Sequence, residues 1–487
     1  MASSGKPGAA AAQTTASASM RRRTPPPALL EELARRFGER FSASTAMCLQ
    51  HGTDESHYAP VPPDAVVFPL TTEEVALIVR LCGDGATPVI PFGVGSSIEG
   101  HVLAVEGGIC IDLSRMNQVL SVQTEDLTAT VQAGATREDL NRALNHTGFF
   151  FSVDPGANAS IGGMVATGAS GTNSVRYGTM RDNVLCLTVV TAQGKIVRTA
   201  RRARKSSAGY SLTQLFTGSE GTLGVITEVT VKLHPQPEAM AAAVVDFPDT
   251  GAAVATVIQA IQMGIPLARA EMLDALSIRA INAHSHTCLV EAPTLFLEFC
   301  GSQTQIDAQS SLVRELADGN GGGDFTWATR PEDRSRLWTP RHHAYFASLQ
   351  LKPGSRSFTT DACVPISRLA ECLAKTVADI DETGLTVPVF GHVGDGNFHC
   401  LILVDPDAPD EVAAAEALSH RIIMRALAHD GTSSGEHGVG LHKIGYLEEE
   451  HGVDAVEMMA RIKQALDPDN ILNPGKVLRL QRRTASA

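Results

Sequence analysis

The sequence lacks several features that would each place it in a broad class of protein. Its nine cysteines are scattered from Cys48 to Cys400 with no C-x-x-C pair, which fits a reducing compartment and argues against a cysteine-rich zinc site. No uninterrupted apolar run is long enough to span a bilayer, so any membrane contact would be peripheral. Basic residues are outnumbered, and the net charge of −13 argues against a nucleic-acid partner.

The first 27 residues contain no acidic side chain. They are rich in alanine and serine and include Arg21, Arg22 and Arg23, a composition that suits mitochondrial import. They also contain a proline run and lack the bulky apolar face of a targeting helix. We therefore predict a disordered tail over residues 1–27 and a cytoplasmic protein, at most peripheral at the inner membrane. A mitochondrial location is the alternative.

The remaining chain is long enough to bury a sizeable core and to divide into two or more domains. Leu29, Leu33 and Phe37 have helical spacing within an N-terminal segment over residues 28–58. In the stretch that follows, strand-like and helical patterns alternate: strands at 66–68, 107–120 and 128–135, and helices that begin at Thr72 and Thr136.

Residues 154–178 are glycine-rich and nearly uncharged, yet strand-like segments flank them on both sides. A flexible linker would not need the apolar residues Ile161, Met164 and Val165. We therefore interpret the segment as a close-packed ligand loop, not a spacer. Its backbone N–H groups and hydroxyls suit a phosphate-bearing cofactor.

A strand over residues 225–231 ends in a proline-rich stop at 234–237, which we predict to be a domain boundary. Helical and strand-like stretches alternate again over residues 238–477, and this pattern predicts a second domain of the α+β class. Residues 478–487 form a predicted tail. The sequence contains no internal repeat.

Two histidines, His392 and His399, flank an Asp395-Gly396 pair between apolar runs, a pattern that predicts a β-hairpin. Counting outward from a two-residue turn pairs residue 392 with residue 399, with Cβ atoms about 5 Å apart. Two imidazoles at that distance fit one metal ion. The alternative, two polar residues that bond only to the backbone at a strand end, remains open.

A third ligand is available in the glycine-rich stretch "SSGEHGVG", where Glu436 precedes His437. Two imidazoles and one carboxylate bind a divalent metal and leave coordination positions open, as in catalytic sites. His437 would then lie beside the metal, free to act as a base. The alternative is a glycine-rich connection with a salt-bridged glutamate.

Six motifs occur in a fixed order between about residues 55 and 477: "PFGVGSS", "DPGANASIGGMVATGASGTNSVRYGT", "GSEGTLGVITEVTVKL", "GHVGDGNFH", "GEHGVG" and "LDPDNILNPGK". Together they resemble the flavin-dependent D-2-hydroxyacid dehydrogenases of the vanillyl-alcohol oxidase superfamily, most closely their cytochrome-linked D-lactate dehydrogenase branch. The resemblance implies an α+β fold. A two-subdomain FAD-binding domain over 59–237 would precede an α+β cap with an antiparallel sheet over 238–477, whose C-terminus returns to the flavin.

The resemblance also implies which residues bind FAD. These are glycines and small polar residues of the glycine-rich loops, one proline, one apolar contact and an asparagine near the C-terminus: Gly93, Gly95, Ser96, Ser97, Pro155, Gly156, Ser160, Gly162, Gly163, Thr167, Ser170, Gly171, Gly178, Glu220, Gly221, Ile226 and Asn473. Some relatives attach FAD through a histidine near the first loop. His101 is out of register with that position, so we predict a non-covalent flavin.

For the chemistry, the resemblance implies a divalent metal (zinc, manganese or iron) on His392, His399 and Glu436, with His437 as the base. Arg341 matches the arginine that binds the substrate carboxylate, and Asn397 matches a substrate-binding position; Arg356 is a weaker candidate for the carboxylate. Relatives that oxidise 2-hydroxyglutarate have an additional lysine where this chain has Thr359 and Thr360. A small acid is therefore expected.

The implied reaction is the oxidation of D-lactate to pyruvate, with glycolate or D-2-hydroxyglutarate as alternative substrates. The sequence has no nicotinamide site, haem motif or iron-sulfur cluster motif, so the electron acceptor would be external: a cytochrome, a quinone or another flavoprotein. Two other classes stay open, a metal-dependent hydrolase and a non-catalytic flavin-binding subunit of an electron-transfer complex. A homodimer is also compatible with the sequence.

Overall fold

The structure is a computed structural model that describes residues 22–480. Most of the two predicted tails, residues 1–21 and 481–487, lies outside the described residues. Within residues 22–27, Arg23 is half-buried and Pro25 is buried, so this part of the predicted tail is held against the fold. Arg23 donates from Nη2 to the Asn470 carbonyl over 2.5 Å and pairs with Glu106 over 2.8 Å. These partners are far away in the sequence, so the composition of residues 1–27 could not predict that Arg23 is held in place.

The N-terminal half, residues 22–235, contains two main sheets and a short two-stranded one. The first main sheet has the strand order β1-β2-β4-β3; β2, β4 and β3 are parallel, and β1 pairs with β2 in the antiparallel sense. Its elements are β1 Phe41–Ser42, β2 Ala65–Val67, β3 Val89–Phe92, β4 Ile109–Asp112, the helices α1 Pro27–Phe37, α2 Thr45–His51 and α3 Thr72–Asp84, and the 3-10 turn η3 Gly38–Arg40.

The second sheet is antiparallel, with the order β5-β6-β10-β8-β9. Its apolar residues share one core with those of the first sheet, since Val79 and Ile111 belong to the same buried cluster as Val131 and Val229. Its strands are β5 Val119–Gln123, β6 Thr128–Gln132, β8 Val184–Val190, β9 Ile196–Arg198 and β10 Val225–Lys232. The strands β7 Phe149–Phe150 and β11 His234–Pro235 form the separate two-stranded sheet. The helices of this part are α4 Arg137–Ala143, α5 Ile161–Thr167, α6 Ser174–Tyr177, α7 Met180–Asn183 and α8 Leu212–Phe216.

The cap region, residues 239–428, is built on one eight-stranded sheet whose pairs are all antiparallel. The main path is β15-β12-β14-β13-β18-β19-β16, and β17 also pairs with β19. The strands are β12 Ala239–Asp246, β13 Leu267–Leu273, β14 Thr294–Gly301, β15 Thr326–Ala328, β16 Arg356–Thr359, β17 Ala362–Cys363, β18 Val389–Gly391 and β19 Asn397–Val404.

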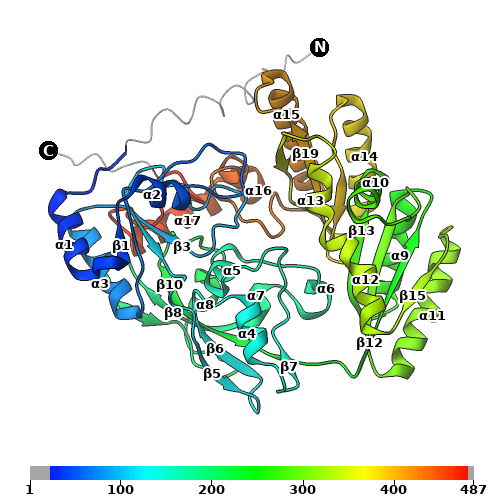
Figure 1. Ribbon diagram of the computed structural model, residues 1–487, viewed down its shortest axis with the longest axis horizontal. Coiled ribbons are helices and arrows are strands. Elements are labelled where there is room, and N and C mark those ends of the chain that lie inside the picture. The colour runs from blue at the N-terminus through cyan, green and yellow to red at the C-terminus, as the bar shows by residue number, and fades with distance from the viewer. Residues whose placement is uncertain (1–21, 481–487) are drawn as a thin grey trace.

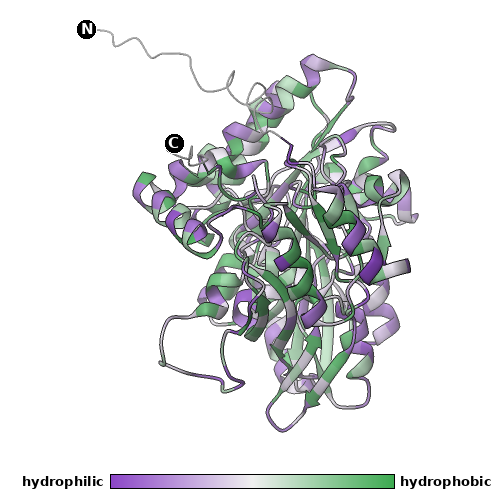
Figure 2. Cartoon of the chain, turned by 90° about the vertical axis from the view of Figure 1, so that its left-hand side faces the viewer, coloured by the Kyte–Doolittle hydropathy of each residue, from purple (hydrophilic) through white to green (hydrophobic). Residues whose placement is uncertain are grey.

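Helices cover both faces of the cap sheet. Alternate residues of β12 enter two different cores: Ala243 and Val245 belong to one, and Ala242 and Val244 to the other. The first core packs under α9 Thr250–Gln262, α11 Gln303–Gly319, α14 Ile366–Thr383 and α15 Pro409–Ala428, and the second under α10 Ala275–Ser285, α12 Pro331–His342 and α13 Ala344–Leu349. Figure 2 turns toward the viewer the side of the molecule that carries α1, where the strands are mostly hydrophobic and the helices around them have hydrophilic segments. The α+β fold with an antiparallel cap sheet is therefore confirmed.

The hairpin that contains the two histidines has a different register from the prediction. β18 pairs with β19 so that Phe390, not His392, lies opposite His399. Residues 392–396 form a longer connection, in which the His392 carbonyl accepts from Asp395 N over 2.9 Å. Gly396 is needed here for a close approach, because a Cβ would lie 2.1 Å from the Val364 carbonyl oxygen. The shift is by two residues, so both histidines still face the same side.

The C-terminal segment, residues 429–480, leaves the cap and returns to the N-terminal half (Figure 1). It contains η4 Lys443–Tyr446, α16 Leu447–His451 and α17 Val453–Leu466. After α17 it runs beside β3, where Val89 N donates to the Ile471 carbonyl over 2.7 Å and Asn473 N donates to the Val89 carbonyl over 2.8 Å. Between residues 22 and 480 no helix combines the length and the apolar character needed to cross a membrane.

A buried lysine holds this return in place, and its removal should destabilise the protein. Lys463 is 4% exposed, pairs with Asp467, and donates to the carbonyls of Thr222 and Leu472 over 2.7 and 2.8 Å. We expect Lys463→Met to cost about 3–5 kcal/mol, because it leaves the Asp467 carboxylate buried without its cation. Urea and thermal unfolding would measure the loss.

Arg461→Met is the matched control on the same helix. Arg461 pairs with Glu457 at the surface, where the two side chains are 73% and 57% exposed. Exposed pairs contribute about 1 kcal/mol or less. Equal unfolding midpoints for Lys463→Met and the unsubstituted protein would contradict the role assigned to Lys463.

Candidate active site

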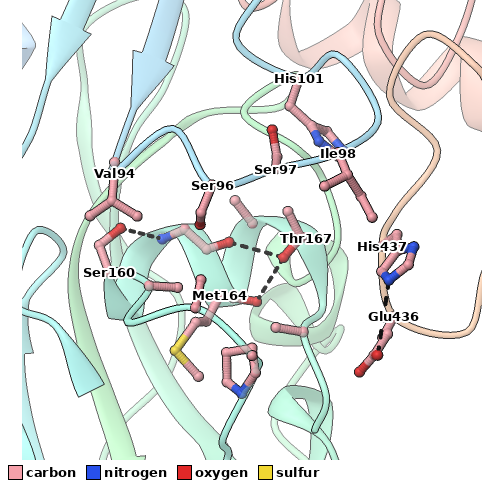
Figure 3. Close-up of a pocket in the computed structure, with 18 of the residues that line it drawn as sticks. Val94, Ser96, Ser97, Ile98, His101, Ser160, Met164, Thr167, Glu436 and His437 are labelled. Carbon is pink, nitrogen blue, oxygen red and sulfur yellow. Dashed lines mark hydrogen bonds and ion pairs between the residues drawn. The ribbon is translucent and has the colours of Figure 1, made fainter. Parts of the chain in front are cut away.

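A cavity of about 800 Å³ lies where the glycine-rich loops of the N-terminal half meet the cap region and the C-terminal segment. Figure 3 shows the loop residues Val94 and Ser160 on one side and Glu436 and His437 on the other. The cavity is lined by every residue predicted to bind FAD except Gly178: Gly93, Gly95, Ser96, Ser97, Pro155, Gly156, Ser160, Gly162, Gly163, Thr167, Ser170, Gly171, Glu220, Gly221, Ile226 and Asn473.

The structure gives Gly178 a different task. It ends α6 with a φ of 76°, and a Cβ there would lie 2.6 Å from a carboxylate oxygen of Asp182. Both observations describe a turn that only glycine forms without strain. Gly178 does not line the cavity. Its place in the motif is explained by this turn.

Close backbone contacts shape the cavity wall. A Cβ on Gly162 would lie 2.5 Å from the Ala133 Cβ, and a Cβ on Gly93 would lie 2.3 Å from Ser160 Oγ. Ser160 also caps α5, accepting from Gly163 N over 3.3 Å (Figure 3). A Cβ on Gly156 would meet no atom within 4 Å, so its backbone faces open space. The wall thus exposes main-chain groups to a long cavity, which fits a large polar cofactor.

On the opposite wall two imidazoles converge on one carboxylate. The Glu436 Oε1 atom lies 3.0 Å from His392 Nε2 and 3.3 Å from His399 Nε2. The two imidazole rings are nearly perpendicular, with centroids 5.4 Å apart. The three side chains come from two separate segments and line the same cavity. They form the set of ligands predicted from the sequence.

The other nitrogen of each ring is held by the protein. His392 Nδ1 donates to Glu271 Oε1 over 2.7 Å, and His399 Nδ1 donates to the Thr360 carbonyl over 3.2 Å. Each bond assigns a proton to Nδ1 and turns Nε2 toward Glu436. This is the arrangement that orients histidine ligands in metal sites.

Asp361 lies close enough to be considered a fourth ligand, since one atom each from Asp361, His399, Glu436 and His437 lie within 4.8 Å of one another. Its oxygens are already engaged. Oδ2 accepts the N–H groups of Glu436 and His437, both over 2.8 Å, and Oδ1 accepts from Asn397 Nδ2 over 2.9 Å. Asp361 therefore fixes the loop that carries Glu436 and is not free to bind a metal.

The charges in this cluster compensate one another. Burial would raise the pKa of Glu436, but the neighbouring His392 and His399 hold it well below its ordinary value. Burial would lower the pKa of His392, but the carboxylates of Glu271 and Glu436 raise it above its ordinary value. The site is thus arranged around an ionised Glu436.

His437 stacks on His399, with ring centroids 5.0 Å apart and planes 14° apart. Its Nδ1 is buried, has no hydrogen-bond partner among residues 22–480, and lies 3.8 Å from both Glu99 Oε1 and Asp361 Oδ2. Burial lowers the pKa of His437, and the carboxylate of Asp361 only partly opposes this. A neutral imidazole at the cavity wall is suited to accept a proton.

Arg341 lies in the cavity wall on α12. Its Nε and Nη2 atoms donate to Glu271 Oε2 over 3.0 and 2.5 Å, and the guanidinium lies over the Phe390 ring at 5.4 Å. Nη1 makes no hydrogen bond to any residue that the structure describes, so it remains available for an anionic ligand. The predicted position of Arg341 in the site is therefore compatible with its predicted role.

Two other predicted substrate contacts are placed elsewhere. Asn397 does not line the cavity, because its amide nitrogen donates to Asp361 and, over 3.1 Å, to the Ala362 carbonyl. Arg356 donates to the His57 carbonyl over 3.1 Å, away from the cavity wall. Asn397 therefore acts on the site through Asp361. Of the two threonines, Thr359 lines the cavity and Thr360 is buried behind it.

His101 lines the cavity, as its position after the first glycine loop suggested. Its Nε2 lies 3.1 Å from Glu220 Oε2. Burial lowers the pKa of His101, but the carboxylate of Glu220 outweighs this and raises it. The non-covalent attachment of the flavin stays a prediction.

Sequence reasoning missed two carboxylates at the centre of the site, Glu271 and Asp361, both fully buried. Their partners lie 36 or more residues away in the chain, and neither belongs to a glycine motif. A local signal existed for Glu271, which is the only acid of the strand "LARAEML", whose other residues are apolar apart from Arg269. A charge in such a strand is costly unless it has a partner, so it indicates an interaction.

Two family models match the chain: "FAD binding domain" over residues 63–200 and "FAD linked oxidases, C-terminal domain" over residues 236–477. Among solved structures, p-cresol methylhydroxylase with substrate bound aligns with a TM-score of 0.77 at 17% identity, over 94% of this chain and 98% of that one. An alkyldihydroxyacetonephosphate synthase aligns with a TM-score of 0.70 at 20% identity, over 93% and 85% of the two chains. At such identities the likeness shows the shared fold alone.

Curated relatives are far more similar in sequence. A probable mitochondrial D-lactate dehydrogenase of Danio rerio is 50% identical, over 91% of this chain and 90% of its own. A mitochondrial D-lactate dehydrogenase [cytochrome] of Arabidopsis thaliana is 46% identical, over 88% and 76% of the two chains. Glycolate oxidase subunit GlcD of Bacillus subtilis is 34% identical, over 90% and 94%. The chain therefore belongs to the family of FAD-dependent D-2-hydroxyacid dehydrogenases.

Proposed function

We propose that the protein oxidises D-lactate to pyruvate, with FAD in the glycine-lined half of the cavity and a divalent metal on His392, His399 and Glu436. The observation that carries this proposal is the convergence of two imidazole Nε2 atoms on Glu436, in the wall that faces the glycine-rich loops. The names of the relatives with 40–50% identity support D-lactate as the substrate.

FAD would be held by the main-chain groups around Gly156, Gly162 and Gly163, and when bound it supplies the hydride acceptor. The metal would be held by the three converging side chains, and it supplies a Lewis acid for the substrate hydroxyl. Two imidazoles and a carboxylate suit zinc, manganese or iron. Both donor sets are in place in the structure, since the Nδ1 bonds turn both Nε2 atoms toward Glu436 and Gly156 faces open space.

The remaining steps belong to the chain's own residues. His437 would accept the hydroxyl proton at Nε2, the nitrogen that lies 4.0 Å from Glu436 Oε1. Its Nδ1 faces the carboxylates of Glu99 and Asp361, which would stabilise the imidazolium that forms. Arg341 would bind the substrate carboxylate through Nη1, and the carboxylate of Glu271 fixes its guanidinium.

The cavity wall favours a small monocarboxylate. A second arginine, Arg269, also lines it, but Arg269 donates to Asn173 Oδ1 over 2.9 Å and to Asp154 Oδ2 over 3.3 Å. The other candidate position is Thr359, which carries no charge. Glycolate and D-2-hydroxyglutarate remain alternative substrates. The relatives named glycolate oxidase subunit GlcD are less similar, at 33–34% identity.

We further propose a cytochrome as the electron acceptor and a mitochondrial location. Several of the relatives carry both terms in their names. The cytoplasmic location predicted from the composition of residues 1–27 is not supported by them. A hydrolase is excluded by the match of residues 63–200 to an FAD-binding domain. A non-catalytic flavin subunit is the remaining alternative of another class.

The direct test is anaerobic reduction. Purified yellow protein should bleach in the visible range when mixed with D-lactate, and more slowly or not at all with L-lactate, glycolate or D-2-hydroxyglutarate. His437→Ala should slow bleaching by about 10²–10⁴-fold, the usual contribution of a general base, with flavin still bound. No bleaching by any 2-hydroxyacid in a flavin- and metal-loaded protein would refute catalysis and favour the subunit alternative.

Arg341→Met should raise the KM for D-lactate by roughly 10–100-fold, because a hydrogen bond to a charged group contributes about 1.5–3 kcal/mol. Steady-state kinetics with an artificial acceptor would measure it. Arg336→Met is the control on the same helix, since Arg336 pairs with Asp333 at the surface and its side chain is 78% exposed. The role of Arg341 would be wrong if both variants had the KM of the unsubstituted protein.

Glu436→Gln should remove one of the three ligands and with it most of the bound metal, while the visible flavin spectrum remains. Metal content after dialysis, measured by plasma mass spectrometry, is the readout. Glu449→Gln, an exposed glutamate of α16 in the same C-terminal segment, serves as the control. Equal metal content in both variants would overturn the assignment of Glu436.

A further inference from the structure

One buried carboxylate joins the two candidate binding groups of the site. Glu271 lies on β13 and is 0% exposed. Its Oε1 accepts from His392 Nδ1 over 2.7 Å, and its Oε2 accepts from Arg341 Nε and Nη2 over 3.0 and 2.5 Å. Both oxygens are thus engaged, each by a different candidate binding residue. Glu271 itself does not line the cavity, so it stands behind both groups.

The apolar surroundings of Glu271 make a charge at this position costly unless it has binding partners. Its neighbours on the strand, Ala270 and Met272, are buried in an apolar core, and Phe296 lies opposite it on β14. Burial of a charge in such a place costs several kcal/mol unless hydrogen bonds and opposite charges compensate. Burial would raise the pKa of Glu271, but His392 and Arg341 lower it below its ordinary value. The carboxylate is therefore ionised and bound on both sides.

We propose that Glu271 is a positioning residue that fixes the metal ligand His392 and the carboxylate-binding Arg341 relative to each other, so that metal affinity and substrate affinity depend on the same side chain. The inference rests on the proposed function. It adds that Glu271, on the strand β13, sets the distance between the groups that bind the substrate hydroxyl and the substrate carboxylate. The chain provides no second residue that contacts both His392 and Arg341 among the interactions of the described residues.

Glu271→Gln separates this role from a merely structural one. A glutamine has nearly the same shape, but only one of its two terminal atoms accepts a hydrogen bond. If the amide oxygen faces His392, the NH₂ group faces the donors of Arg341. If the oxygen faces Arg341, the NH₂ group displaces the proton from His392 Nδ1 and moves it to Nε2, where the metal binds. In either orientation of the amide, one of the two partners, His392 or Arg341, loses its acceptor. If the amide alternates between the two orientations, both partners are disturbed.

The experiment measures metal and substrate affinity on the full-length flavin-loaded protein. Zn²⁺ alone is titrated into chelator-treated protein in competition with a chromogenic chelator, which requires no turnover. The KM and kcat for D-lactate are measured separately on metal-saturated protein. For Glu271→Gln we expect Zn²⁺ to bind about 10–100-fold more weakly, as for other residues that orient metal ligands. We expect the KM to rise about tenfold or more.

Glu298→Gln is the matched control. Glu298 is a buried glutamate of the adjacent strand β14, 3% exposed, with Arg269 Nη1 at 3.7 Å. Its substitution should cost stability in a similar way and leave both affinities unchanged. Glu271→Asp keeps two acceptor oxygens on a shorter side chain, and it should recover part of both affinities. If Glu271→Gln does not fold, Glu271→Asp carries the test, with smaller losses expected in both quantities.

The proposal is overturned if a folded Glu271→Gln or Glu271→Asp binds Zn²⁺ with the affinity of the unsubstituted protein. It is also overturned if only one of the two affinities changes, because Glu271 would then serve one partner alone. Failure of the proposed function has a different signature. In that case the unsubstituted protein binds Zn²⁺ but is not reduced by any 2-hydroxyacid, while the dependence of the Zn²⁺ affinity on Glu271 is still measured.

Discussion

The candidate site depends on the hydrogen bonds that hold the Nδ1 atoms of two imidazole rings. Glu271 and the Thr360 carbonyl accept from His392 Nδ1 and His399 Nδ1, which directs both Nε2 atoms to Glu436. Without these two bonds either ring is free to rotate or to exchange its tautomer, and three ligands no longer converge. The hairpin of β18 and β19 does not itself provide these two acceptors. Glu271 comes from the strand β13, and the Thr360 carbonyl comes from the segment between β16 and β17.

A second constraint unites three parts of the chain at the cavity. The loop that carries Glu436 is bound to the cap by Asp361, and it is bound to the N-terminal half by Glu220, which accepts from Val439 N over 2.6 Å and from Gly440 N over 2.9 Å. Lys443 lies beneath, fully buried, 2.8 Å from Glu99 Oε1. Buried charges of this kind contribute little net stability, but they allow few alternative arrangements. The position of the loop relative to the glycine-lined wall is thereby defined.

The sequence predicted what short-range patterns encode. Glycine and small polar residues with fixed spacing predicted the cavity wall, and the two histidines and Glu436 were found because they lie in compact motifs. The hairpin register was wrong because Asp395-Gly396 suggested a tight turn, whereas Gly396 is required for packing against Val364. Glu271 and Asp361 could not be found in this way, since their partners come from other elements. The predicted substrate contact of Asn397 stays a prediction, because the structure shows only that its amide nitrogen donates to Asp361 and Ala362.

The return of the C-terminus has a consequence for the order in which the protein matures. Asn473 contributes to the cavity wall, and its side-chain amide donates to the carbonyls of His101 and Glu220 over 3.2 and 2.8 Å. It lies near the end of a chain whose first strands belong to the same wall. During synthesis the glycine loops therefore emerge long before the residue that closes them. Cofactor binding in its final form therefore has to follow the synthesis of the segment that contains Asn473.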